Sequence, residues 1–195
     1  MARARLVGRV PSPLAHIGSA LALRHLSRPG VWPIDRVGIA AALASIAPDV
    51  DMVLVVLLPG GLAWHHGPTH SVVGATFLAG AVAVAMRVRK PSSVAIVLLS
   101  GVFHVLLDGL TGNPAEAAQF GVPWAWPFSN DRWISSHAIF VPFGIDREGF
   151  LWHMISGAGR AYGVEAAFVA ACFGVVLAAR SLVSGGSEAR TTDGS

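Results

Sequence analysis

The sequence predicts an all-α fold, a multi-pass transmembrane helical bundle, and three observations support this prediction. Hydrophobic residues make up 53% of the 195 positions and charged residues only 13%, compared with about a quarter in an average soluble domain. Apolar stretches of helical length recur along the chain, separated by short segments rich in proline, glycine or basic residues. Alanine, valine, leucine and glycine dominate these stretches, and such residues suit closely packed membrane helices.

The charged residues are few and clustered. The net charge is +3, and the 14 Lys and Arg residues occur in clumps, so we interpret them as topology signals at helix ends. They form no stripe typical of nucleic-acid surfaces, and we predict no nucleic-acid partner. Cys172, which lies in an apolar run, is the single cysteine of the sequence, so no intrachain disulfide is possible. Residues 1–11 form a basic N-terminal arm without a long apolar stretch, so we expect no cleaved signal peptide.

The first half of the chain contains two predicted helices and one short apolar run. They cover residues 12–26, 34–47 and 52–58. Pro13 fits the first position of the first helix, because the backbone N–H that proline lacks has no partner within the helix at that position. Pro48 ends the second helix, because proline cannot continue a regular helical ladder. The run at 52–58 is too short to cross a bilayer alone.

The second half contains a helical hairpin and a final apolar helix. The predicted helices cover residues 69–86, 91–108 and 164–182, with a shorter helical stretch at 150–156. Each arm of the hairpin has about twenty residues and so a length of roughly 30 Å, which matches a bilayer core. A loop rich in glycine, proline and tryptophan follows at 112–147. We therefore expect one membrane-embedded domain at 12–183 and a disordered polar tail at 184–195.

Alternation of helix direction gathers the polar residues at the two ends of the bundle. Helices joined by short turns run antiparallel, so every second turn lies at the same end. One end receives four histidines and three aspartates: His16, Asp49, Asp51, His65, His70, His104 and Asp108. The other end receives one aspartate and seven basic residues: Asp35, Arg24, Arg28, Arg36, Arg87, Arg89, Lys90 and Arg180. Because ionisable residues at membrane depth are functional by default, the first end is the predicted site.

The residue types at this end predict a metal centre. His104 and Asp108 are four residues apart, so their side chains project from one face of a helix. A carboxylate buried in this apolar segment needs a cation or a hydrogen-bond network. A divalent metal meets that need, and a simple His–Asp hydrogen bond at a helix end is the alternative. Imidazole and carboxylate ligands without a thiolate favour zinc, so we predict one or two divalent ions, zinc before others, held by the seven residues.

Individual residues also have structural alternatives. Asp49 and Asp51 follow a proline break and could cap the next helix. We interpret His66 as a structural loop residue rather than a ligand. Further site candidates are His137 and His153, whereas His25 at the basic end has no expected role. Four tryptophans are expected to form an interfacial aromatic belt or to line a substrate cleft: Trp124, Trp126, Trp133 and Trp152.

Five motifs occur together and in order. They are Pro-Leu-Ala-His at 13–16, Pro-Asp-Val-Asp at 48–51, His-His-Gly-Pro-Thr-His-Ser at 65–71, His-Val-Leu-Leu-Asp-Gly-Leu-Thr at 104–111 and Gly-Val-Pro-Trp-Ala-Trp-Pro-Phe at 121–128. The set resembles the bacterial inner-membrane family of membrane-bound metal-dependent hydrolases, over about residues 12–130. That family is distantly similar to the zinc-dependent phospholipases C and single-strand nucleases.

The resemblance implies a ligand set and a cellular location. By position it makes metal ligands of His16, one aspartate of the 49/51 pair, His70, His104 and Asp108, with Asp108 as the bridge between ions. The family usually shows His-Arg-Gly where this chain has His65-His66-Gly67, and an arginine there would contact a phosphate. The implied location is the bacterial inner (cytoplasmic) membrane, as a multi-pass protein.

Three functions are compatible with these residues. The first is a metal-dependent hydrolase acting on a phosphoester or lipid-like substrate, with membrane lipid as its surroundings and Asp49 or Asp51 as the catalytic proton acceptor. The second is a transporter or proton relay, which should distribute ionisable groups across the membrane depth. The third is a metal-stabilised membrane scaffold without catalysis.

Overall fold

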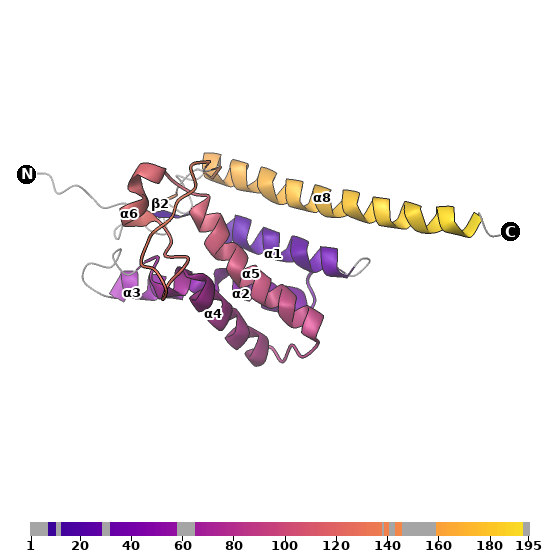
Figure 1. Cartoon of the computed structure of the whole chain (residues 1–195), viewed down its shortest axis with the longest axis horizontal. Coiled ribbons are helices and arrows are strands. Elements are labelled where there is room, and N and C mark those ends of the chain that lie inside the picture. Colours follow the sequence, from indigo (N-terminus) through magenta and orange to yellow (C-terminus); the bar gives the residue numbers. More distant parts are fainter. Residues whose placement is uncertain are drawn as a thin grey trace, which may run out of the picture.

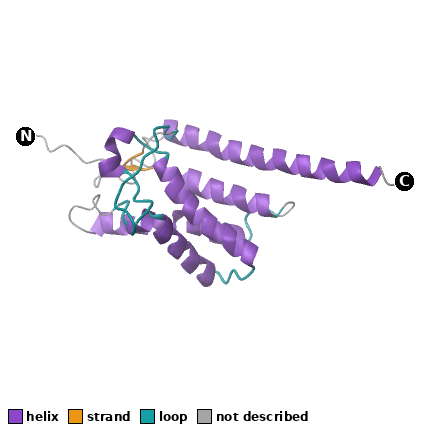
Figure 2. Ribbon diagram, viewed as in Figure 1, coloured by secondary structure: helices purple, strands orange, loops and turns teal. Residues whose placement is uncertain are grey.

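The computed structural model describes residues 8–10, 13–28, 32–57, 65–137, 139–140, 143–145 and 159–192. Helices dominate these residues (Figures 1 and 2). The α-helices are α1 (Pro13–Ser27), α2 (Arg36–Ile46), α3 (Met52–Leu57), α4 (Val72–Ala85), α5 (Pro91–Gly109), α6 (Ala117–Phe120) and α8 (Gly159–Thr192). Three short 3₁₀ helices accompany them: η1 (Ala47–Asp51), η3 (Pro68–His70) and η4 (Pro114–Glu116). The all-α prediction is confirmed, with one small sheet in addition.

That small sheet joins the N-terminal arm to the long loop. Strand β1 (Gly8–Val10) pairs antiparallel with β2 (Phe143–Ile145), and Arg9 lies opposite Gly144. Strand β1 lies within the predicted basic N-terminal arm at 1–11, for which the sequence predicts no strand. Pairing with a partner so distant in sequence leaves no local signal, because the hydrogen bonds of a strand depend on the second strand.

Local capping residues decide where the helices begin. Asp35 caps α2 by accepting a hydrogen bond from the backbone nitrogen of Gly38 at 2.8 Å. Ser71 caps α4 in the same way through Gly74, at 2.9 Å. Because Ser71 starts the helix, α4 has only 14 residues and a length of about 21 Å. The predicted helix 69–86 is therefore shorter than a bilayer core, since its first residues form η3 instead.

Helix α5 lies at the centre of the bundle, packed against α1, α2 and α4. Small side chains line the contacts, among them Ala40 and Ala44 of α2 and Ala79 and Ala83 of α4. At Gly101 of α5, an added Cβ would lie 2.9 Å from both the Ala75 backbone oxygen and the Ala79 Cβ. Close packing of α4 and α5 thus requires glycine at this position.

Within the described residues, three helical segments are long and apolar enough to cross a membrane: Arg36–Leu54, Pro91–Gly109 and Ala161–Ser181. The first combines α2, η1 and α3, so Pro48 tightens the helical path into a 3₁₀ turn without ending the apolar segment. Helix α8 packs along α1 and extends past the rest of the bundle (Figure 1). It starts before and ends after the predicted helix 164–182. Large apolar side chains such as Phe77 and Val175 are exposed on outer faces, as lipid-facing residues are.

The loop tryptophans have different environments. Trp124 is exposed and Trp126 is half-buried, as an interfacial belt requires. Trp133 instead packs over α5, where its ring occupies the space that a side chain at Gly109 would need. Trp152 and the predicted helical stretch 150–156 lie outside the described residues.

Candidate metal centre

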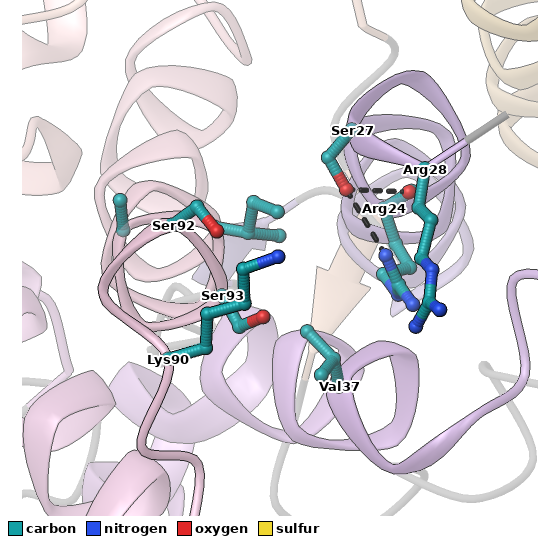
Figure 3. A pocket seen from close by; sticks show the side chains of 9 residues that line it. Arg24, Ser27, Arg28, Val37, Lys90, Ser92 and Ser93 are labelled. Atoms are coloured by element: carbon teal, nitrogen blue, oxygen red, sulfur yellow. Dashed lines mark hydrogen bonds between the residues drawn. The ribbon is translucent and has the colours of Figure 1, made fainter.

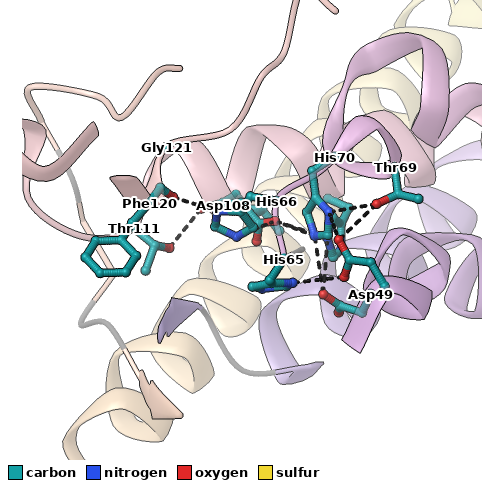
Figure 4. Close-up of polar contacts among 12 residues, drawn as sticks. Asp49, His65, His66, Thr69, His70, Asp108, Thr111, Phe120 and Gly121 are labelled. Carbon is teal, nitrogen blue, oxygen red and sulfur yellow. Dashed lines mark hydrogen bonds and ion pairs between the residues drawn. The ribbon is translucent and has the colours of Figure 1, made fainter. Parts of the chain in front are cut away.

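The predicted end of the bundle carries a compact cluster of histidines and aspartates (Figure 4). Its members come from the start of α1, from η1, from the segment before and within η3, and from the last turns of α5. The structure brings all seven predicted residues together: His16, Asp49, Asp51, His65, His70, His104 and Asp108. Six are buried, and Asp49 is the exception, with 32% of its side chain exposed.

Asp108 lies at the middle of this cluster. The i, i+4 spacing on α5 places the Asp108 Oδ2 atom 3.1 Å from Nε2 of His104. The same oxygen is 3.4 Å from Nε2 of His70, while Oδ1 is 3.4 Å from Nε2 of His16. The rings of His16 and His104 stack with centroids 4.1 Å apart. The two carboxylate oxygens therefore face different histidines.

Several inward-facing atoms of the cluster have no hydrogen-bond partner among the residues that the structure describes. These buried atoms are Nε2 of His65, His66, His70 and His104, and Oδ2 of Asp108. Buried polar atoms are almost always paired, so each such atom requires an explanation. Among the described residues there are three groups in which the ligand atoms all lie within 4.8 Å of one another: His65, His66 and His70; His16, His104 and Asp108; Asp49, His70 and His104. The cluster could hold a metal ion.

The separations fit that interpretation. Nitrogen and oxygen ligands of zinc lie about 2.0–2.2 Å from the ion, so two ligands of one tetrahedral site are about 3.4 Å apart. The Nε2–carboxylate distances around Asp49 and Asp108 range from 3.1 Å to 3.7 Å. The donor set, imidazole nitrogens and carboxylate oxygens without a thiolate, suits the same divalent ions.

Outer hydrogen bonds hold the imidazole rings from behind. Nδ1 of His104 lies 2.7 Å from the Ser45 carbonyl oxygen, and Nδ1 of His66 lies 2.5 Å from that of Phe120. A carbonyl accepts, so each Nδ1 carries the proton and Nε2 is left as a lone-pair donor. Such partners orient metal-binding histidines in proteins.

Asp51 holds two further rings. Its Oδ1 is 2.9 Å from Nδ1 of His65, and its Oδ2 is 3.1 Å from Nδ1 of His70. Thr69 donates its hydroxyl to the same Oδ2 at 3.1 Å. Both oxygens of Asp51 are thus engaged on the outer side of the histidines. Asp49, by contrast, faces inward: its Oδ1 is 3.4 Å from Nε2 of His70 and 3.7 Å from Nε2 of His104.

The pKa values of His66 and His70 are shifted in opposite directions. Burial, aided by the neighbouring His65 and His70, lowers the pKa of His66 well below its usual value. Burial also acts to lower the pKa of His70, but the carboxylates of Asp49 and Asp51 beside its ring and the charge of Asp108 outweigh it and raise the pKa to about 10. The carboxylates of three aspartates, Asp49, Asp51 and Asp108, therefore all lie beside the His70 ring.

Two residues in or beside the cluster were missed by sequence reasoning. His66, interpreted as a structural loop residue, lies inside the cluster with Nε2 3.7 Å from Oδ2 of Asp108. Its backbone adopts a φ of 56°, a left-handed conformation that sequence does not announce. Glu165 of α8 is buried and accepts a hydrogen bond from the backbone nitrogen of Ala15 at 3.0 Å. A lone glutamate in an apolar helix was the available signal.

Two further histidines, His25 and His137, lie outside the cluster. His137 is exposed, and its Nδ1 lies 3.0 Å from the Ser136 hydroxyl. His25 is at the other end of the bundle, where its Nε2 lies 2.8 Å from a guanidinium nitrogen of Arg180. His153 lies outside the described residues. Of the additional candidates, His137 is thus not brought to the site.

The apolar helices and the polar cluster at one end define a multi-pass membrane protein with a candidate metal centre. The chain belongs to the YdjM inner membrane protein family, whose model matches residues 14–183. The inner-membrane location is therefore established, and the match continues through α8, beyond the predicted resemblance over 12–130. The family description names a location and no reaction. No curated protein and no solved structure matches the chain.

Proposed function

We propose that this protein is a membrane-embedded, metal-dependent hydrolase that acts on a phosphoester or lipid-like substrate. The observation that carries the proposal is the set of buried Nε2 and carboxylate atoms that face one another and find no hydrogen-bond partner in the described part of the chain. When bound there, a divalent ion supplies Lewis-acid chemistry and makes a nearby water more nucleophilic.

Asp108 is the best-placed residue to hold two ions. Its Oδ1 faces His16, and its Oδ2 faces His104 and His70. A carboxylate whose oxygens serve different ligand groups is suited to bridge a two-metal site. His16 and His104 then complete one group, while Asp49 and His70, with His104 at the boundary, form the neighbouring group.

The two aspartates of the Pro-Asp-Val-Asp motif take different roles in this proposal. Oδ1 of Asp51 already pairs with His65, and its Oδ2 accepts a hydrogen bond from Thr69 and lies 3.1 Å from Nδ1 of His70, so Asp51 positions the rings. Asp49 has an inward-facing oxygen and an exposed edge. It is therefore the carboxylate that can accept a proton from water and pass it to solvent.

The alternative functions predict other arrangements or outcomes. A proton relay requires ionisable groups at successive depths of the membrane, whereas the seven site residues lie together at one end. A metal-stabilised scaffold has the same ligands but no turnover, so only an activity measurement separates it from the hydrolase.

The test combines metal analysis with a substrate screen on detergent-purified protein. The Asp108→Asn variant keeps the side-chain shape but loses the charge that balances a divalent cation. Asp131→Asn is the matched control, because Asp131 is exposed and distant from the cluster in sequence and contacts. We expect the parent and the control to bind zinc and to hydrolyse phosphoester or phospholipid substrates, and Asp108→Asn to lose both properties.

Two results would contradict the proposal. Full metal content in Asp108→Asn removes this residue from the ligand set. Metal binding by the parent without turnover of any phosphoester or phospholipid favours the scaffold.

A further inference from the structure

A pocket of about 410 Å³ lies at the opposite end of the bundle from the histidine cluster (Figure 3). It opens between the last turn of α1 and the first turn of α5, with Val37 of α2 on a third side. Its polar lining consists of three basic and three hydroxyl side chains: Arg24, Arg28, Lys90, Ser27, Ser92 and Ser93. None of the lining residues is acidic.

The positive charge of this pocket is only partly balanced by the protein. Arg24 is buried and donates to both oxygens of Asp35, and a further nitrogen donates to the Ser27 hydroxyl at 3.2 Å. The side chains of Arg28 and Lys90, in contrast, form no ion pair with any other described residue. Figure 3 shows the Lys90 side chain extending from the start of α5 toward α1. Two cations thus border the pocket without a protein counterion among the described residues.

Hydroxyl groups and a helix start add further attraction for an anion. The Ser92 and Ser93 side chains, in the first turn of α5, form no hydrogen bond with other described residues. The positive end of the α5 dipole lies at the same place. Arg28 directly after α1, Lys90 at the N-cap of α5 and the two serine hydroxyls therefore reinforce the helix start, and together these groups match the oxygens of a phosphate.

The position of the pocket indicates where such a phosphate is found. Its walls come from the ends of two candidate spans, Arg36–Leu54 and Pro91–Gly109, so it lies at the boundary between membrane and water. Three apolar residues, Val37, Ala95 and Ile96, complete its lining. We propose that this pocket is a second binding site, which holds the anionic phosphate of a lipid headgroup or of a free phosphate anion.

The test uses the full-length protein in detergent and two double variants that remove equal charge from the same end. Arg28→Gln/Lys90→Gln changes the pocket, whereas Arg36→Gln/Arg89→Gln leaves its lining intact. All four side chains are exposed, so both variants should fold, which a thermal unfolding curve checks. Binding is measured by calorimetry with inorganic phosphate and with short-chain phosphatidylglycerol, and phosphatidylcholine of equal chain length is the lipid control.

We expect the pocket variant to bind the anionic probe at least about tenfold more weakly than the parent. The control variant should stay within about twofold of the parent, because screened surface charges contribute little. Equal losses in both variants, or no binding of either probe by the parent, would overturn the proposal. Preference for phosphatidylglycerol assigns the site to a lipid headgroup, and equal affinity for inorganic phosphate assigns it to the free anion. Zinc content should be unchanged in both variants, so the result is independent of the proposed hydrolase.

Discussion

The two ends of the bundle bury charged residues in opposite ways. At the basic end, Arg24 is 4% exposed and its guanidinium is matched by Asp35 and Ser27. At the other end, Asp108 is 3% exposed, yet none of the described residues donates a hydrogen bond to its Oδ2. Burial of charge costs free energy unless partners compensate it. Arg24, whose hydrogen bonds are satisfied within the protein, supports the fold. Asp108, whose Oδ2 is not satisfied by the described residues, is the residue for which we propose a metal ion as partner.

The largest expected effect concerns a proposed metal ligand in the histidine cluster. His104→Ala should lower zinc affinity by more than about 100-fold, since it removes an inward nitrogen shared by two of the three ligand groups. His25→Ala, at the basic end, should leave zinc content unchanged. Zinc per chain after dialysis measures both, and an equal loss in the two variants would abolish the distinction between the ends.

The next effect tests the outer layer of the cluster. Asp51→Asn should lower zinc affinity by about 10–100-fold, the range seen when an orienting partner of a metal-bound histidine is removed. The smaller loss than in His104→Ala is expected because the ring nitrogens remain present. Competition with a chelator gives the affinity. A loss as large as that of His104→Ala would make Asp51 a direct ligand.

A substitution at the basic end should lower the stability of the protein and leave metal binding unchanged. Asp35→Asn keeps an N-cap for α2 but removes the carboxylate that pairs with Arg24. We expect a loss of about 1–2 kcal/mol in the free energy of unfolding, with zinc content unchanged. Thermal unfolding in detergent checks the first statement, and metal analysis checks the second.

The smallest effect is the pH dependence of the same ion pair. The hydrogen bond from Arg24 lowers the pKa of Asp35 to about 2, from an ordinary value of 3.8. Because the folded-state pKa is the lower one, the stabilisation is present above pH 3.8 and is lost as the pH falls toward 2. The unfolding curves of the parent and Asp35→Asn should converge over this window. A constant difference between pH 6 and pH 2 would show that the pair does not titrate as described.

The sequence alone determined the broad organisation of this protein. Apolar runs between proline, glycine and basic breaks predicted the helices, and alternating direction predicted that His16, Asp49, His70 and Asp108 would meet at one end. Both inferences succeed because they depend on local composition and chain connectivity. The four-residue spacing of His104 and Asp108 is likewise a local property of a helix.

Only the tertiary structure decided which atom faces which. The left-handed backbone at His66 turns that ring into the cluster, and packing places Asp51 behind the histidines and Asp49 in front of them. The end of the bundle at which a residue lies follows from the position of that residue in the chain. The direction of its side chain depends on neighbours that are distant in sequence, such as Phe120 for His66. For the same reason the basic pocket between α1 and α5 became visible only once both helices were in place.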